Sequence, residues 1–314
     1  MAAISASMVK ELREITGAGM MDCKKALAET DGNMDEAVEF LRKNGQAKAE
    51  KKAGKIAAEG LCRVAVKEDG KTAAVVEVNS QTDFAAKTAD FTEFAEAVAN
   101  QAVVTTAANI EAFLDEPWAL DPSKKISEVL VEKIAKIGEN LNVRRFEKLE
   151  SPNGIVVSYV HGGGRIGVLV AADTDVVNDA VKEALNNIAM QIAALSPKYV
   201  SRDEIGEDFI AHEKEILLAQ IMNDPKESQK PQKVIDGMIN GRVQKEMKEI
   251  CLLDQVYVKA EDGKQSVAQY IAQVAKENGA NLSVTKFVRF ETGEGIEKVE
   301  ENFAEEVAKQ MAGN

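Results

Sequence analysis

The chain has 314 residues, of which 45% are hydrophobic and 29% are charged, a composition typical of a folded protein with two or three domains. Lysine and arginine number 39 against 52 aspartates and glutamates, which gives a net charge of −13. Such an acidic surface repels phosphate, so the composition argues against general binding to nucleic acid or to an anionic membrane. No apolar run reaches the length of about 18 residues that a membrane-spanning helix needs.

The residue types that usually carry chemistry are few and scattered. The cysteines, Cys23, Cys62 and Cys251, form no close-spaced pair, and the histidines are His161 and His212 alone. This pattern predicts reduced, ordinary thiols and no metal site. Charged residues occupy the start of the chain where a secretory leader needs an apolar segment, so we expect a cytoplasmic location.

The region 1–54 predicts a small helical domain. Apolar residues recur at spacings of three and four, with Ser5 and Asn33 at capping positions, and they indicate three short helices. Gly45 is expected to end the third helix, and a linker helix should follow it. Four lysines fall on one face of that linker: Lys48, Lys51, Lys52 and Lys55. The stripe is either an electrostatic docking surface or, as we favour here, a solvated helix face.

Two related α+β halves are predicted next, at 55–150 and at 151–291. Each begins with two strand patterns joined by a turn, continues with helices and ends in a strand, as expected for antiparallel sheets covered by helices. The segment NLNVRRFEKLE at 140–150 aligns without gaps with NLSVTKFVRFE at 281–291. This repetition indicates an internal duplication.

The second copy contains an insertion. The separation of Val75 from Asn140 is 65 residues and that of Val168 from Asn281 is 113, which leaves about 48 extra residues in the second copy. We assign them to 203–250, where two helical patterns flank the polar turn DPKESQKP.

Two such helices predict an antiparallel hairpin, and its narrow apolar seam with charged flanks is typical of a coiled coil. The hairpin divides the second half into 151–202 and 251–291. After the last strand, an acidic amphipathic segment at 292–314 predicts a C-terminal helix, with apolar positions at Ile296, Val299, Phe303 and Val307.

The motif HGGG at 161–164 occurs in the oxyanion loops of esterases, but no GxSxG nucleophile elbow accompanies it here. We therefore expect a glycine-rich hairpin turn with an exposed His161. The sequence contains neither a P-loop motif nor an EF-hand spacing. No catalytic set is predicted, which favours a binding protein over an enzyme.

The segment SQTDFAAK at 80–87 lies between a predicted strand and a predicted helix, and two interpretations of it stand. In the first, which the residues alone favour, Thr82 or Asp83 caps the helix and Phe84 packs into the core. In the second, Phe84 is an exposed aromatic ring beside an acid on a rigid turn, which is a typical anchor for a protein partner.

Several long motifs, in order along nearly the whole chain, resemble those of the elongation factor Ts family. They are KELREITGAGMMDCKKAL, EVNSQTDFAAK, AKIGENLNVRRF, YVHGGGRIGVLVA and FVRFETGEGIEKVE. The resemblance implies a ubiquitin-associated-like domain at 1–54, a core of two related halves, an inserted coiled-coil hairpin and a C-terminal helical module at 292–314.

The resemblance also implies which residues contact a partner. Asp83 and Phe84, flanked by Thr82 and Ala85, would reach toward the magnesium and phosphate-binding region of elongation factor Tu. Ala85 stands where the family commonly has valine, which should reduce local packing without moving the anchor.

Further contacts with the partner are implied elsewhere in the chain. The methionine pair, Met20 and Met21, would contact the GTPase domain of elongation factor Tu. Core contacts would come from Ile137 and Gly138 in KIGEN and from His161 in the glycine-rich turn.

The function that the resemblance implies is guanine-nucleotide exchange on elongation factor Tu, bound in its GDP-loaded and nucleotide-free forms. No catalytic residue, metal or cofactor of its own and no direct contact with nucleic acid or membrane is expected. The alternative is an adaptor that binds partners without altering nucleotide affinity. Whether the complex forms a dimer is left open.

Overall fold

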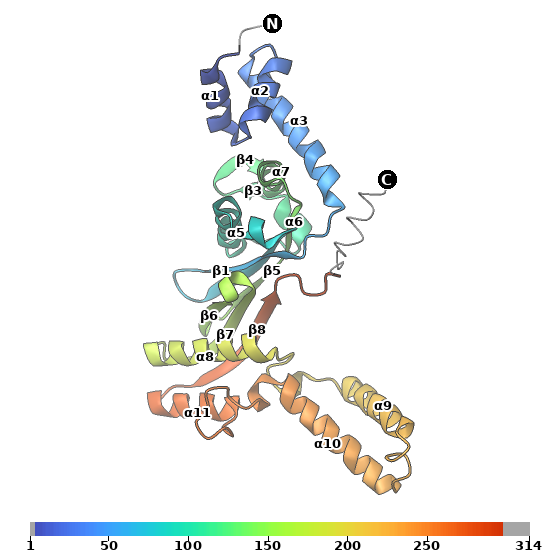
Figure 1. Ribbon diagram of the computed structural model, residues 1–314. Coiled ribbons are helices and arrows are strands. Elements are labelled where there is room, and N and C mark those ends of the chain that lie inside the picture. The colour runs from blue at the N-terminus through green and yellow to red at the C-terminus, as the bar shows by residue number, and fades with distance from the viewer. Residues whose placement is uncertain (1–3, 298–314) are drawn as a thin grey trace.

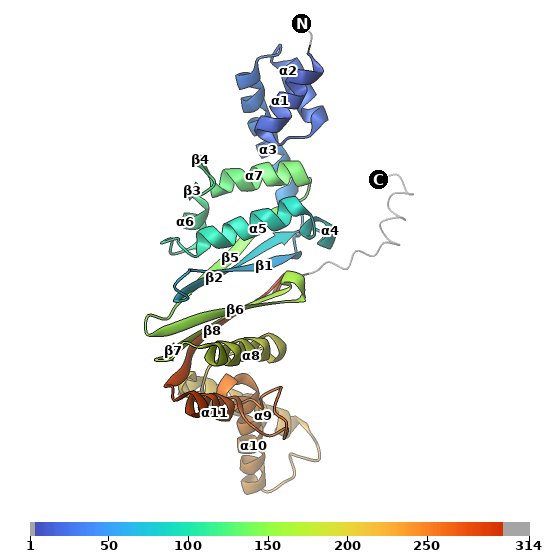
Figure 2. The ribbon, with the colours of Figure 1, turned by 90° about the vertical axis from the view of Figure 1, so that its left-hand side faces the viewer.

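A computed structural model describes residues 4–297 as an elongated molecule of mixed α and β structure (Figure 1). Its centre consists of two three-stranded antiparallel sheets that pack against each other. Helices cover the outer face of each sheet, so that four layers follow one another in Figure 2: helix, sheet, sheet and helix. The expected α+β class is confirmed.

Three helices form the N-terminal unit at one end of the molecule (Figure 1): α1 (Ala6–Thr16), α2 (Met20–Glu29) and α3 (Met34–Ala53). They pack around a small apolar cluster that includes Leu12 and Leu27, both fully buried. Side chains cap the first and third helices, as the sequence predicts.

The expected end of the third helix at Gly45 is wrong, because α3 runs through this residue to Ala53 without a separate linker helix. Gly45 is buried against α7 (Ile126–Ile137), and a Cβ built on it would lie 3.6 Å from the Cβ of Ala135. The space between the two helices fits a methyl group but no larger side chain. Tertiary packing therefore outweighs the low helix propensity of glycine here.

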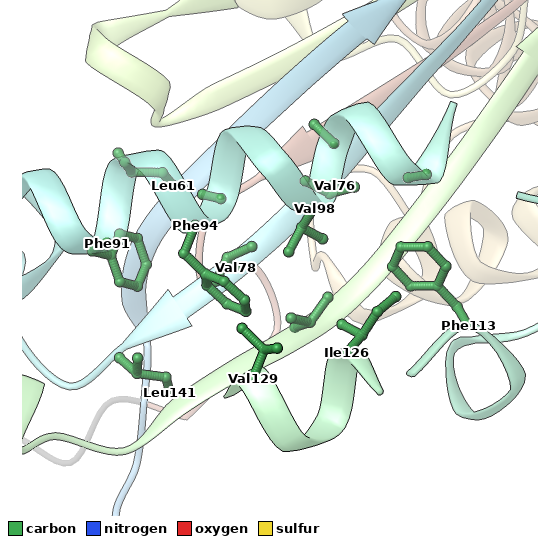
Figure 3. Close-up of a cluster of buried hydrophobic side chains, with 14 of the residues drawn as sticks. Leu61, Val76, Val78, Phe91, Phe94, Val98, Phe113, Ile126, Val129 and Leu141 are labelled. Carbon is green, nitrogen blue, oxygen red and sulfur yellow. The ribbon is translucent and has the colours of Figure 1, made fainter. Parts of the chain in front are cut away.

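The first sheet has the strand order β1 (Glu59–Val66), β2 (Thr72–Ser80), β5 (Leu141–Glu150). Between β2 and β5 the chain forms α4 (Asp83–Ala86), α5 (Ala89–Ala102), α6 (Ile110–Leu114), the short strands β3 (Pro117–Trp118) and β4 (Asp121–Lys125), and α7. Figure 3 shows the core beneath these helices, where Phe94 of α5 lies near Val78 of β2 and Val129 of α7.

The second sheet repeats this order with β6 (Gly154–His161), β7 (Ile166–Thr174) and β8 (Leu282–Glu291). Its outer face is covered by α8 (Asp179–Leu195) and α11 (Val267–Asn278). Short 3-10 turns occur in this half at Gly162–Gly164, Arg202–Glu204 and Leu252–Asp254.

The two sheets agree residue by residue, which supports the duplication. Ser80 pairs with Leu141 in the first sheet, and Thr174 pairs with Leu282 in the second. Both pairings contain one irregularity, and it falls at equivalent positions, between Glu77 and Val78 and between Ala171 and Ala172.

The pairing also measures the insertion. The paired residues Ser80 and Leu141 are 61 positions apart, and Thr174 and Leu282 are 108 apart, so the second copy is longer by 47 residues. The sequence spacing gave one residue more, because it matched Val75 to Val168, and the register matches Val75 to Leu169.

The insertion contains α9 (Glu207–Asn223) and α10 (Gln232–Ile250), which pack side by side as a hairpin projecting from the second half (Figure 1). Its inner face buries one residue of α9 and several of α10: Ile221, Ile235, Ile239, Val243 and Met247. Residues 292–297 form turns and irregular backbone, and the rest of the expected C-terminal helix lies outside the described residues.

The contact at Gly45 gives a prediction. Gly45→Ala should raise the free energy of unfolding by up to about 1 kcal/mol, because alanine favours the helix and its Cβ meets ordinary van der Waals contacts. Gly45→Leu should lower it, because a longer side chain meets α7. Thermal unfolding followed by circular dichroism measures both changes.

Gly237→Ala is the matched control, since this glycine lies in α10 with no neighbour within 4 Å of its built Cβ. It should give the gain in helix propensity alone. Equal stability of Gly45→Leu and Gly45→Ala would contradict the packing explanation.

Candidate functional site

The turn after β2 holds an aromatic ring on the surface. Thr82 accepts a hydrogen bond at Oγ1 from the amide of Ala85 (3.2 Å) and so caps α4, a helix of a single turn. Ala85 and Ala86 face inward and are buried, whereas the Phe84 side chain is 79% exposed. The interpretation that Phe84 packs into the core is therefore wrong, although its proposed cap, Thr82, is correct.

An ion pair lies beside the ring. The Lys87 ammonium donates to Asp83 Oδ2 at 2.6 Å and lies 5.9 Å from the centroid of the Phe84 ring. The hydrogen bond from Lys87 lowers the pKa of Asp83 below its ordinary value. Both side chains are exposed, so the pair contributes little to folding, but it places a carboxylate and an ammonium group next to the ring.

The segment after α7 lies against this turn. Gly138 ends α7 in the left-handed conformation (φ 84°), and it is exposed while Ile137 is half-buried. Glu139 follows, and its carboxylate accepts hydrogen bonds from the amide (3.0 Å) and the hydroxyl (2.7 Å) of Thr82. The fold thus brings together two groups of sequence-predicted contact residues, Thr82–Ala85 and Ile137–Gly138.

Two residues in this contact were missed from the sequence. Glu139 holds Thr82, and Gln81 accepts a hydrogen bond from the amide of Asn140 at 2.8 Å. Glu139 and Gln81 stand directly beside residues that the sequence singled out. That adjacency was the available signal for them.

His161 lies on the second sheet, at the end of β6, and it is exposed. Its Nδ1 is 2.9 Å from the hydroxyl of Tyr159. The glycine-rich turn that follows packs on β1, where the Arg63 guanidinium donates to the carbonyl of Gly163 (3.4 Å). Because α4 also contacts β1, the His161 turn and the Phe84 turn lie at the same end of the sheets (Figure 2).

The methionine pair is separate from this group. Met20 and Met21 begin α2 in the N-terminal unit, and their side chains are 59% and 74% exposed. Lys48 of α3 pairs with Asp22 next to them (3.0 Å), and Lys52 donates to the carbonyl of Gly138. Two lysines of the predicted stripe are therefore engaged in contacts within the molecule.

Within residues 4–297, no three histidine, cysteine, aspartate or glutamate side chains are grouped as metal ligands. The same part of the chain contains no helix that is both long and apolar enough to cross a membrane. All three cysteines are free and buried, and burial raises the pKa of Cys62 to about 11. These thiols are poorly suited to act as nucleophiles.

At this end of the sheets the structure places an exposed aromatic ring, a charged neighbour and two strand-end turns. This is the class of surface with which a protein binds another protein. In a comparison with known proteins, the family model described as elongation factor TS matches residues 81–294 of the chain.

Proteins called elongation factor Ts are similar over almost their whole length. That of Clostridium botulinum strain Eklund 17B is 52% identical over 98% of this chain and 99% of its own. That of Clostridioides difficile strain 630 is 51% identical over 99% and 100%. The chain belongs to the elongation factor Ts family, a family of translation elongation factors.

The exposure of Phe84 gives a prediction about stability. Phe84→Ala should change the free energy of unfolding by less than about 0.5 kcal/mol, because the ring is largely solvated in the folded chain. Phe91→Ala is the matched control: the ring is fully buried in α5, and its loss should cost about 3–5 kcal/mol. Denaturant unfolding of both variants measures the difference, and a cost for Phe84→Ala near that of Phe91→Ala would support a core position instead.

Proposed function

We propose that the protein is a guanine-nucleotide exchange factor that binds elongation factor Tu and promotes the release of its GDP. The observation that carries this proposal is the Phe84 ring, 79% exposed on a capped turn beside the charged Asp83. Membership of the elongation factor Ts family supports the choice of partner. The proposed place of action is the cytoplasm, where translation takes place.

The mechanism follows from what holds GDP in a GTPase. Phosphate contacts and Mg²⁺ provide most of the local charge that binds the nucleotide. Burial of Phe84 in the partner can contribute roughly 1.5–3 kcal/mol, which offsets a distortion of the loops around the metal and phosphates. Asp83 disfavours phosphate charge nearby and competes for the groups that organise the metal.

Reciprocal coupling makes this an exchange reaction. If the protein binds the nucleotide-free partner more tightly than the GDP-bound partner, GDP affinity must fall by the same ratio in the complex. GTP can then bind the emptied site and release the factor. The proposed role requires no bond chemistry and no cofactor in this chain.

The remaining contact residues would increase the area of the interface. Met20 and Met21 would anchor the N-terminal unit, proposed as a ubiquitin-associated-like domain, on the GTPase domain of the partner. Ile137, Gly138 and His161 would extend the surface around Phe84. The hairpin, proposed as a coiled coil, has no assigned contact.

The exchange reaction is directly measurable. Stopped-flow release of labelled GDP from elongation factor Tu should be accelerated by the protein, and Phe84→Ala should reduce that acceleration roughly 10- to 100-fold, the equivalent of the lost burial. Leu120→Ala is the control, because Leu120 is an equally exposed apolar residue (77%) next to β4. It should leave the rate unchanged.

The outcomes separate the candidate functions. Binding to elongation factor Tu without faster GDP release would contradict exchange and favour an adaptor. Full activity of Phe84→Ala would refute the assignment of the anchor while leaving the exchange activity itself in place.

The charge of Asp83 gives a pH prediction. Since Lys87 lowers the pKa of Asp83 below its ordinary value, the carboxylate is ionised at neutral pH. The Asp83-dependent part of the exchange rate, wild type against Asp83→Asn, should be constant between about pH 6 and 8. A titration of that difference within this range would show that another group controls the site.

A further inference from the structure

We infer that Glu139 is a positioning residue for nucleotide exchange, because its carboxylate holds the turn that presents Phe84 in the conformation that binds the partner. The inference rests on the proposed function. Glu139 itself needs no contact with the partner in this role; it acts through Thr82.

The turn needs such support because α4 is too short to be stable alone. Fixing the first turn of a helix is unfavourable, since several backbone dihedrals are ordered for one hydrogen bond. The Thr82 cap contributes one bond to Ala85, and the exposed Asp83–Lys87 pair contributes little. The two bonds from Thr82 to Glu139 are charge-assisted, and they fix the capping residue to the end of α7.

The duplication provides an internal comparison, because both halves keep the same hydrogen bonds around the turn that follows the middle strand. These shared bonds are called the frame below. The hydroxyl of Ser80 donates to the carbonyl of Thr82 at 2.9 Å, and in the second half the hydroxyl of Thr174 donates to the carbonyl of Val176 at 3.0 Å. These are equivalent bonds by the strand register.

A second pair of bonds is equivalent in the same way. Gln81 accepts from the amide of Asn140, and Asp175 accepts from the amide of Asn281, each at 2.8 Å. The connection between the strand-end turn and the last strand therefore exists in both copies.

The two hydrogen bonds from Thr82 to the Glu139 carboxylate, called the clamp from here on, have no counterpart at the equivalent positions of the second copy. By the register, Ala280 stands in the position of Glu139 and Val176 in that of Thr82, so neither the carboxylate nor its hydroxyl donor is present. The residue in the position of Phe84 is Asn178, which caps α8 directly. The second copy instead joins its turn to the last strand through the Asp175 carboxylate, which accepts from the amide (2.8 Å) and the side-chain amide (2.7 Å) of Asn281. The bonds between Glu139 and Thr82 therefore occur in the copy that presents the ring, and they act on the residue that caps α4.

The expected effect of breaking the clamp is a smaller population of the binding conformation. When only a fraction of molecules is competent, the apparent dissociation constant rises by the inverse of that fraction. Glu139→Ala should raise the factor concentration that gives half-maximal GDP release about 10-fold, with the maximal rate within about 2-fold of wild type. Glu139→Gln keeps one acceptor oxygen and should recover most of this loss.

The experiment is stopped-flow release of labelled GDP from elongation factor Tu across a range of factor concentrations. Asp175→Ala is the matched control. It removes a carboxylate that joins the strand-end turn to the last strand in the second copy, at the position of Gln81, and it should leave half-saturation unchanged. Thermal unfolding accompanies each variant. Thr82→Val, which copies Val176, tests the other partner of the clamp should Glu139→Ala fold poorly.

A double-mutant cycle tests the route of the effect. In the Phe84→Ala background, Glu139→Ala should raise the half-saturating factor concentration by less than about a further 2-fold, because the effects of residues that act through one another are not additive. An unchanged half-saturation in Glu139→Ala and Thr82→Val, or a full additional loss in the Phe84→Ala background, would overturn the inference. Failure of the wild-type protein to accelerate release would instead overturn the proposed function.

Discussion

The close packing of the two sheets is the constraint on which the rest of the molecule depends. A Cβ built on Gly167 of β7 would lie 2.9 Å from Val75 Cγ2 and 3.0 Å from Cys62 Cβ, so this position accepts no side chain without movement. Because the inner faces are occupied by each other, the helices must cover the outer faces. The turns at the strand ends then remain as the surface where contact residues can be placed.

A buried carboxylate joins the two halves near the end of the sheets at which the Phe84 and His161 turns lie. Glu77 of β2 is fully buried and accepts hydrogen bonds from the amide of Gly293, just after β8, at 2.8 Å and from Arg145 at 2.6 Å. Burial raises the pKa of Glu77, but the hydrogen bonds and the charge of Arg145 outweigh it and leave the pKa below its ordinary value. A charge that is satisfied from both halves fixes how they meet, because separation would leave it buried without partners.

Local patterns predicted most of the elements, because their signals lie within one segment. The α9–α10 hairpin follows from two apolar helical patterns that flank one polar turn, and the duplication follows from one repeated strand. Gly45 and Phe84 were misread from the residues alone for one reason. What surrounds them is set by distant segments, α7 for Gly45 and the residues after α7 for the Phe84 turn.

The role of Glu139 is not predictable from the sequence for the same reason. Its partner Thr82 is 57 residues away, and a glutamate after a helix-ending glycine is ordinary on a solvated surface. The Glu139–Thr82 contact emerges only once β2 and β5 are paired, since that pairing brings the strand-end turn to the end of α7. Site residues that act directly are visible in motifs, whereas those that hold them are visible in the fold.

The duplication then explains how one frame came to serve two purposes. Each half keeps its paired strands, its bulge and its strand-end hydrogen bonds, and each differs in a connection. The first half presents a clamped turn with an aromatic ring, whereas the second inserts the α9–α10 hairpin between α8 and α11. Connections at a sheet surface tolerate such change at low energetic cost, because the packed sheets supply the stability. In the proposed function, a ring that is held in place before the partner binds would leave binding energy available to distort the partner, because less of that energy is needed to order the turn.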